Sequence, residues 1–234
     1  MRPTFLMVPG WGMDTPVWGE LCSYLSPYQI RFINWNHMDE VHEFEQRVIK
    51  AMAEEENVIL IGWSLGALVA LHVAQQEQVL GIVLLGGTAR FTKAVDYPGW
   101  PASFVTRMKR GILTDKVKTL ARFDTSMFTE QESIYYQTFS TLRARFQDYD
   151  VHSLLVGLSY LLERDMRDTL DAIQTPLLLL HGEADNVCPV AGAYYIQQKT
   201  GARLYVWPEV GHAPHITQAR ECADLIKQFA AEVT

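Results

Sequence analysis

A serine at the centre of a G-x-S-x-G pattern is the first residue whose setting could support catalysis. Ser64 stands between Gly62 and Gly66, after the apolar run 58–61 and before an aliphatic run that predicts a helix. A strand that turns sharply into a helix pushes the hydroxyl of the middle residue outward, and flanking glycines leave room for the crossing chain. The first helical turn also directs unpaired N–H groups at the same place. The spacing therefore predicts a nucleophilic serine beside an anion-stabilising site.

Such a serine needs a base within hydrogen-bonding distance, because its hydroxyl is a weak nucleophile at neutral pH. His212 lies in a loop between Gly211 and Ala213, and Asp185 follows an earlier apolar strand. The order Ser, Asp, His along the chain is the one expected of a triad on a mostly parallel sheet. We expect His212 to take the Ser64 proton and Asp185 to orient the imidazole.

Other residues of the same types leave alternatives open. The acidic rivals of Asp185 are Asp171 and Glu183, and the histidine rivals of His212 are His37, His181 and His215. The small neighbours of His212 favour it, because they let its ring turn inward. The pair His212-x-x-His215 could also indicate a metal site, but no third ligand accompanies it at a suitable spacing. We therefore expect neither a metal nor a cofactor.

An acyl-transfer site also needs N–H donors for the oxyanion that forms on the substrate. The N–H of Leu65, directly after the serine, is one candidate. The glycine-rich turn 9–13 follows the first apolar strand, and we assign the second donor to the N–H of Trp11. Because reacting groups gather at the carboxyl ends of parallel strands, all these loops are expected at one edge of the sheet.

The hydrophobic pattern predicts the elements that position these loops. Unbroken apolar runs predict strands at 5–8, 30–33, 58–61, 79–85, 176–180 and 203–207, with helices between them. This alternation indicates the α/β class, with a mostly parallel sheet of about six strands that helices cover on both faces. In the amphipathic helix that begins near Glu40, the glutamates, including Glu45, are assigned to the solvent face.

The pattern changes between residues 89 and 172, where aromatic and charged residues mix and no buried strand is visible. We expect several short helices there, inserted as a cap, while residues 1–88 and 173–234 form the core. The alternative is that these helices pack elsewhere on the sheet.

Composition limits the classes of partner. A chain of 234 residues with 48% hydrophobic residues can form one large domain, or one domain with an insertion. Its net charge of −7 argues against nucleic acid or an anionic membrane as the main partner. The three widely spaced cysteines suggest no disulfide framework, and the apolar run 5–8 is too short for a signal-peptide core. We therefore expect a cytoplasmic protein without a membrane-spanning segment.

Four segments together resemble a known family: G-W-S-L-G, H-G-x-x-D, G-H-A-P-H and P-G-W-G-M…V-W. They resemble the α/β-hydrolases and, within these, the pimeloyl-acyl-carrier-protein methyl ester esterases of biotin synthesis. The match covers most of the chain and is faint through the cap. It implies the α/β-hydrolase fold, the triad Ser64, Asp185 and His212, and the oxyanion donors Trp11 and Leu65.

Three features differ from that family. Pro9 stands in the oxyanion loop where the family usually has histidine. The loop 34–39 leads almost directly into a helix, where the family has a longer glycine-rich loop. We also expect the first apolar run to be a parallel strand, without the amino-terminal antiparallel strands that are usual in the family.

The resemblance implies a serine esterase that cleaves a medium-chain acyl methyl ester through an acyl-enzyme, without a cofactor. The substrate would be a small ester or one linked to acyl carrier protein. Its acyl chain would lie between core and cap, against aromatic residues for which we select Trp11, Trp63, Phe104, Phe128 and Phe139. The cap aromatics could instead form the cap's own core.

Basic cap residues would hold the acidic carrier protein, and the candidates are Lys118, Arg122 and Arg143. Lys118 and Arg122 lie one turn apart if that segment is helical. A normal mixed surface would have the same composition. Other readings of the site stay open: a general carboxylesterase, a C–C bond hydrolase, a lyase, or a receptor with the same fold and no catalysis.

Overall fold

The computed structural model describes residues 2–146 and 149–234. Its centre is a six-stranded sheet in the order β2-β1-β3-β4-β5-β6, in which every neighbouring pair is parallel. The strands are β1 (Thr4–Val8), β2 (Gln29–Phe32), β3 (Val58–Trp63), β4 (Gly81–Leu85), β5 (Leu177–Gly182) and β6 (Arg203–Trp207). The prediction of a parallel sheet of about six strands is therefore confirmed.

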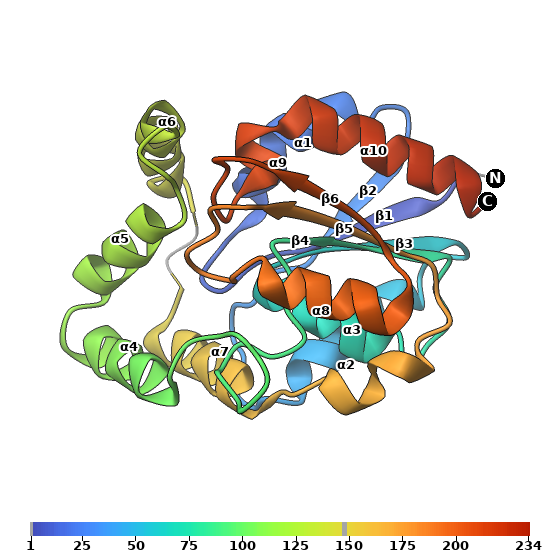
Figure 1. Cartoon of the computed structure of the whole chain (residues 1–234). Coiled ribbons are helices and arrows are strands. Elements are labelled where there is room, and N and C mark those ends of the chain that lie inside the picture. Colours follow the sequence, from blue (N-terminus) through green and yellow to red (C-terminus); the bar gives the residue numbers. More distant parts are fainter. Residues whose placement is uncertain (1, 147–148) are drawn as a thin grey trace.

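Helices cover both faces of this sheet (Figure 1). On one face lie α1 (Gly19–Tyr24) and α10 (Ala219–Glu232); on the other lie α2 (Glu43–Met52), α3 (Leu65–Val73) and α8 (Ala191–Thr200). Every residue of β1, β3, β4 and β5 is buried, whereas β2 and β6 at the edges are partly exposed. Burial on both faces explains why the central strands are continuous apolar runs.

Four helices and a short 3₁₀ helix stand between β4 and β5. They are α4 (Ala102–Thr114), α5 (Lys116–Ser126), α6 (Ser133–Arg143), α7 (Val151–Glu163) and η2 (Arg167–Ala172). Helices α4, α5 and α6 stand beside the edge to which the strands point (Figure 1). In the described part of residues 89–172, β-pairing is limited to isolated bridges. We call this segment the cap; its status as a separate domain stays a prediction.

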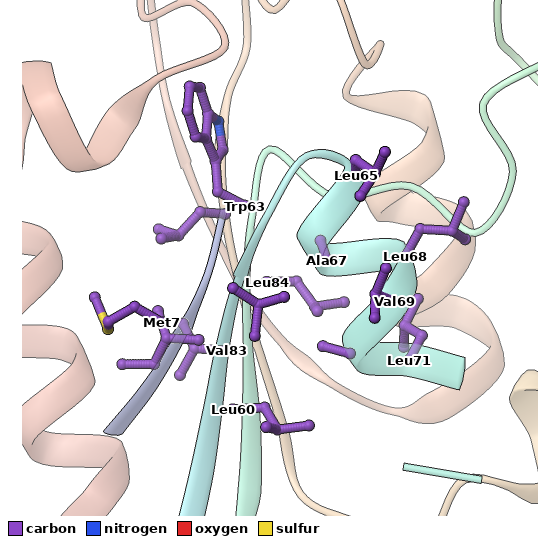
Figure 2. Packing of buried hydrophobic residues seen from close by; sticks show 14 of the residues in the cluster. Met7, Leu60, Trp63, Leu65, Ala67, Leu68, Val69, Leu71, Val83 and Leu84 are labelled. Atoms are coloured by element: carbon purple, nitrogen blue, oxygen red, sulfur yellow. The ribbon is translucent and has the colours of Figure 1, made fainter. Parts of the chain in front are cut away.

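The turn from β3 into α3 is the centre of the core. Figure 2 shows the apolar side chains of α3, including Ala67, beside Leu84 of β4. Almost every residue of α3 is buried, which explains why its sequence has no polar face. A Cβ at Gly62 would lie 2.5 Å from the carbonyl oxygen of Gly66, and one at Gly66 would lie 2.0 Å from that of Val8. Both positions of the pattern therefore require glycine.

The prediction that Glu45 lies on the solvent face was wrong. Its side chain is 5% exposed, its Oε1 accepts a hydrogen bond from the Tyr160 hydroxyl at 2.9 Å, and it pairs with His72 and Arg164. Burial favours a raised pKa for Glu45, but the hydrogen bonds from His72 and Tyr160 lower this pKa below its ordinary value. The carboxylate thus ties α2 to α3 and to α7 of the cap.

Two short helices complete the chain: η1 (Thr15–Trp18), with Asp14 as its N-cap, and α9 (Pro214–Thr217). Within residues 2–146 and 149–234, no helix has both the length and the apolarity needed to span a membrane.

The close contacts at the turn predict the effect of one added methyl group. Gly66→Ala places a Cβ against the backbone of Val8 and Pro9, and this backbone cannot shift without distorting β1. We therefore expect a loss of about 3 kcal/mol in the free energy of unfolding. Gly19→Ala is the matched control, because nothing lies within 4 Å of its Cβ position. This second change should stabilise helix α1 by about 0.5 kcal/mol. Urea unfolding measures both, and equal effects would contradict the steric account of the turn.

Candidate active site

Ser64 connects β3 to α3 in a conformation that is rare for a residue with a side chain. Its φ of 57° and ψ of −116° lie outside the common regions, and the tight fit of the glycines on either side enforces them. The Ser64 N–H donates to the carbonyl oxygen of Leu85, at the end of β4. This is the strained strand–turn–helix geometry that the sequence pattern predicts.

Asp185 and His212 form a hydrogen-bonded pair in the interior. Asp185 Oδ2 lies 2.7 Å from His212 Nδ1 and 3.2 Å from His181 Nε2, and the side chains of Asp185 and His212 are fully buried. The other oxygen, Oδ1, accepts the N–H groups of Val187 and Cys188, each at 2.8 Å. Burial favours a raised pKa for Asp185, but His212 and His181 lower this pKa well below its ordinary value. The ionised carboxylate therefore holds the imidazole with its proton on Nδ1.

The second nitrogen of the His212 ring, Nε2, is buried and hydrogen bonds to no described residue. A Cβ at Gly86 would lie 3.0 Å from His212 Nδ1. The carbonyl oxygen of the preceding residue, Leu85, accepts the hydrogen bond from the Ser64 N–H. Ser64 and His212 therefore both contact the chain segment at the carboxyl end of β4.

The loop after β5 also contacts the serine. The Ser64 side chain is near enough to the Cys188 thiol to lower the pKa of that thiol, so the hydroxyl lies near the loop that carries Asp185. Burial raises the pKa of the Cys188 thiol well above its ordinary value, and the thiol stays protonated. Sequence reasoning missed Cys188 and His181 as neighbours of the predicted triad residues, although both lie within four residues of Asp185.

The turn after β1 lies on another side of Ser64. A Cβ at Gly10 would lie 3.4 Å from the Cβ of Ser64. Trp11 is fixed in place because its Nε1 donates to the carbonyl oxygen of Leu154 in α7, at 2.9 Å. Leu65 is the first residue of α3, so its N–H belongs to the turn that a helix leaves without intrahelical partners. The two predicted oxyanion donors thus lie on chain segments that meet at Ser64.

Trp63 lies beneath the histidine loop. Its Nε1 donates to the carbonyl oxygen of His212 at 2.8 Å, and its ring contacts those of Trp18, His212 and His215. These contacts make Trp63 a support for the loop, in addition to any contact with a ligand.

The selected cap aromatics divide into two groups. Phe104 stacks on Trp100, with ring centroids 4.0 Å apart, and both line a cleft of about 500 Å³ between α4 and α5. Phe128 and Phe139 pack against each other at 5.5 Å and are not among the residues that line this cleft. Both residues pack within the cap, which is the alternative that the sequence left open, and Phe139 also lines a second cleft between α6 and η1.

The cleft adjoins the site. The Trp100 Nε1 donates to the carbonyl oxygen of Val187 in the Asp185 loop at 2.8 Å, and Phe123 meets Trp11 edge-on at 5.2 Å. Its other lining residues include Met108 and three arginines, Arg107, Arg110 and Arg122. Trp100 and Phe123 thus connect this apolar cleft to the Asp185 loop and to the turn after β1, while Ser64, Asp185 and His212 are not among its lining residues.

The three basic candidates for a carrier contact do not share one surface. Lys118 and Arg122 are exposed on α5. The side chain of Arg143 is only 17% exposed; it pairs with the buried Asp124, with Nε 2.9 Å from Oδ2, and donates to the carbonyl oxygen of Gly12. Burial raises the pKa of Asp124 to about 6 despite this pairing. Arg143 therefore joins the cap to the turn after β1, and its position does not fit the expected carrier contact.

Of the rival residues, His181 contacts Asp185 directly, and the other four have different surroundings. Asp171 pairs with Lys199 at the surface, Glu183 and His37 are exposed, and His215 lies between the rings of Trp18 and Trp63. Among the described residues, no group of three or more histidine, cysteine, aspartate or glutamate side chains is placed to hold a metal ion.

Comparison with known proteins places the chain in a family. The model of the alpha/beta hydrolase family matches residues 5–225. The chain is 27% identical to the pimeloyl-[acyl-carrier protein] methyl ester esterase of Vibrio campbellii, over 98% of this chain and 95% of that protein. It is 29% identical to the enzyme of the same name from Nitrosomonas europaea, over 92% and 90%.

Solved structures show the same fold. An esterase from Exiguobacterium antarcticum superposes with a TM-score of 0.84 at 22% identity, over 98% of this chain and 92% of that chain. An enol-lactonase from Burkholderia xenovorans gives 0.87 at 15% identity, over 99% and 92%. The chain belongs to the alpha/beta hydrolase family, and the resemblance inferred from its motifs is confirmed.

The buried His215 predicts how stability depends on pH. Burial, together with the neighbouring His212, lowers the pKa of His215 from 6.5 to about 3. The unfolded chain therefore binds a proton here that the folded chain excludes, so stability falls as the pH drops from about 6.5 toward 3. His215→Phe should reduce the slope of the unfolding free energy between pH 6 and pH 4 by about 1.4 kcal/mol per pH unit.

Urea unfolding across this pH range measures the slope. His152→Phe is the control, because the His152 side chain is 62% exposed, and its slope should equal that of the wild type. An unchanged slope in His215→Phe would show that His215 takes up its proton in the folded state.

Proposed function

We propose that the protein is a serine esterase in which Ser64 attacks the carbonyl carbon of a carboxylic ester. One observation carries this proposal: Asp185 Oδ2 lies 2.7 Å from His212 Nδ1 in the interior, and the serine of the strained strand–helix turn contacts the same end of β4 as this histidine. The arrangement supplies an oriented base next to a nucleophile, which is what acyl transfer from an ester requires.

The proposed steps follow from these positions. His212 Nε2 removes the hydroxyl proton as Ser64 Oγ bonds to the ester carbon, and the N–H groups of Trp11 and Leu65 stabilise the oxyanion. His212 then gives the proton to the alcohol oxygen, the C–O bond breaks, and the acyl group stays on Ser64. Water attacks this acyl-enzyme by the same route, which releases the acid and restores the serine. Asp185 stays ionised throughout and stabilises the imidazolium.

The cap supports a substrate with a medium-length acyl chain, and we propose a methyl ester linked to acyl carrier protein. The cleft of about 500 Å³ has apolar walls suited to methylene groups, and two relatives that match almost the whole chain are named for this activity. Lys118 and Arg122 on α5 are exposed and can contact an acidic carrier, as can Arg107 and Arg110 beside the cleft.

Growth of a biotin-requiring bacterium that lacks this esterase tests the substrate. The wild-type gene should restore growth without biotin, and the Ser64→Ala gene should not, because its product lacks the nucleophile. Rescue by both genes would contradict the proposed chemistry. If neither rescues while the purified wild type cleaves short aryl esters, the methyl ester substrate is wrong and a general carboxylesterase remains.

Purified enzyme tests the carrier contact separately. The double variant Lys118→Glu, Arg122→Glu should raise KM for a carrier-linked ester about tenfold, while KM for a free short-chain methyl ester stays unchanged. Lys50→Glu, an exposed change on α2 at the opposite face of the sheet from α10, is the control and should change neither. If the double variant leaves KM for the carrier-linked ester unchanged, or raises KM for both substrates by the same factor, a carrier contact at α5 is ruled out.

A further inference from the structure

We propose that Glu132, on the cap, is a positioning residue for His212: with the backbone of Met127, it holds the loop that presents the base. The inference rests on the proposed function, since it concerns the same histidine. Sequence reasoning did not select Glu132, and its role is visible only in the contacts between cap and core.

The connection between α5 and α6 lies directly on the loop that follows β6. Three hydrogen bonds join the two segments: His212 N–H to Met127 O at 2.8 Å, Gly211 N–H to Glu132 Oε2 at 3.0 Å, and Thr129 Oγ1 to Glu209 O at 3.0 Å. The backbone donors of the histidine and of the residue before it therefore have their partners on the cap.

Glu132 is the side chain that links the two segments. It is only 5% exposed, and the oxygen that accepts the Gly211 N–H also accepts the N–H of Thr129 at 2.9 Å. One carboxylate oxygen thus bridges the turn of the cap and the loop of the core. An oxygen that accepts two backbone N–H groups at once fixes the two segments in one relative position.

The cap and the histidine loop pack tightly against each other at Gly211. A Cβ at Gly211 would lie 2.4 Å from the Met127 carbonyl oxygen and 2.8 Å from Glu132 Oε2. Glycine is therefore required before the histidine, because the cap backbone occupies the space of a side chain. The sequence argument had attributed this glycine to free movement of the ring; the structure attributes it to contact with the cap.

The core holds the same peptide from the other side. The carbonyl oxygen of His212 accepts the Nε1–H of Trp63, while its N–H donates to Met127. The backbone of His212 is thus held between cap and core, and Asp185 fixes the ring. Loss of the Glu132 link frees the cap side alone, so the histidine can shift while the fold persists. A misplacement of about 1 Å in a reacting group can lower a rate by as much as a hundredfold.

Steady-state kinetics on a short methyl ester test this role. Glu132→Ala should lower kcat by about tenfold and leave KM within about twofold, because the base is displaced and the cleft is not. Glu132→Gln should retain kcat within about threefold, because its amide oxygen can accept both N–H groups that now share Oε2. An unchanged kcat in Glu132→Ala, or a loss confined to KM, would overturn the proposal, as would an equal loss in Glu132→Gln.

Asp115→Ala is the matched control within the cap. Asp115 is exposed and caps α5 by accepting the Lys118 N–H at 3.0 Å, without contact with the histidine loop. Its removal weakens a cap helix but leaves the link intact, so kcat should equal that of the wild type. A tenfold loss in this variant would show that any loosening of the cap lowers the rate, and the specific role of Glu132 would be wrong.

A spectroscopic readout separates this inference from the proposed function. The proton between His212 Nδ1 and Asp185 should give a far-downfield proton NMR signal, identified by its loss in His212→Gln. We expect it in the wild type, Glu132→Gln and Asp115→Ala, and expect it broadened or lost in Glu132→Ala. An unaffected signal in Glu132→Ala would overturn the inference. A wild type that shows the signal but cleaves no ester would overturn only the proposed function.

Discussion

The hydrogen bond between Asp185 and His212 is the interaction on which the arrangement of the site depends. Burying a carboxylate costs free energy unless hydrogen-bond donors surround it. Here the two oxygens of Asp185 accept hydrogen bonds from two backbone N–H groups and contact two imidazole nitrogens. These donors come from the end of β5 and from the loops after β5 and β6, so satisfying one charge fixes several chain segments together. The low pKa that results keeps the carboxylate ionised, which the imidazole needs in order to act as a base.

The parallel sheet brings the remaining groups to this pair. Ser64 follows β3, Trp11 follows β1, and the carboxyl ends of these strands lie side by side in the sheet. The cap also contacts loops of the core at the site. Arg143 reaches the turn after β1 and Glu132 reaches the histidine loop, so both side chains of the cap hold loops of the candidate site from outside the sheet. The same segment also forms the cleft that adjoins the site.

Much of the fold could be predicted from the sequence, because the central strands are buried on both faces and therefore read as short apolar runs between polar or glycine-rich segments. Ser64, Asp185 and His212 could be selected because local patterns and chain order carry the information. The errors have another cause. Glu45 and Arg143 were assigned to surfaces because their partners lie far along the chain, 115 residues away for Tyr160 and 131 for Gly12. No local period reports such a contact, which exists only once the cap has folded onto the core.

Covalent labelling by a fluorophosphonate probe tests the central claim, that Ser64 is a nucleophile activated by the Asp185–His212 pair. The account predicts one probe per chain, located on the peptide that contains Ser64, with no labelling in Ser64→Ala and labelling slowed by at least about a hundredfold in His212→Gln. Peptide mapping by mass spectrometry measures both site and rate. A wild type that fails to react, or that carries the probe on another residue, would contradict the account.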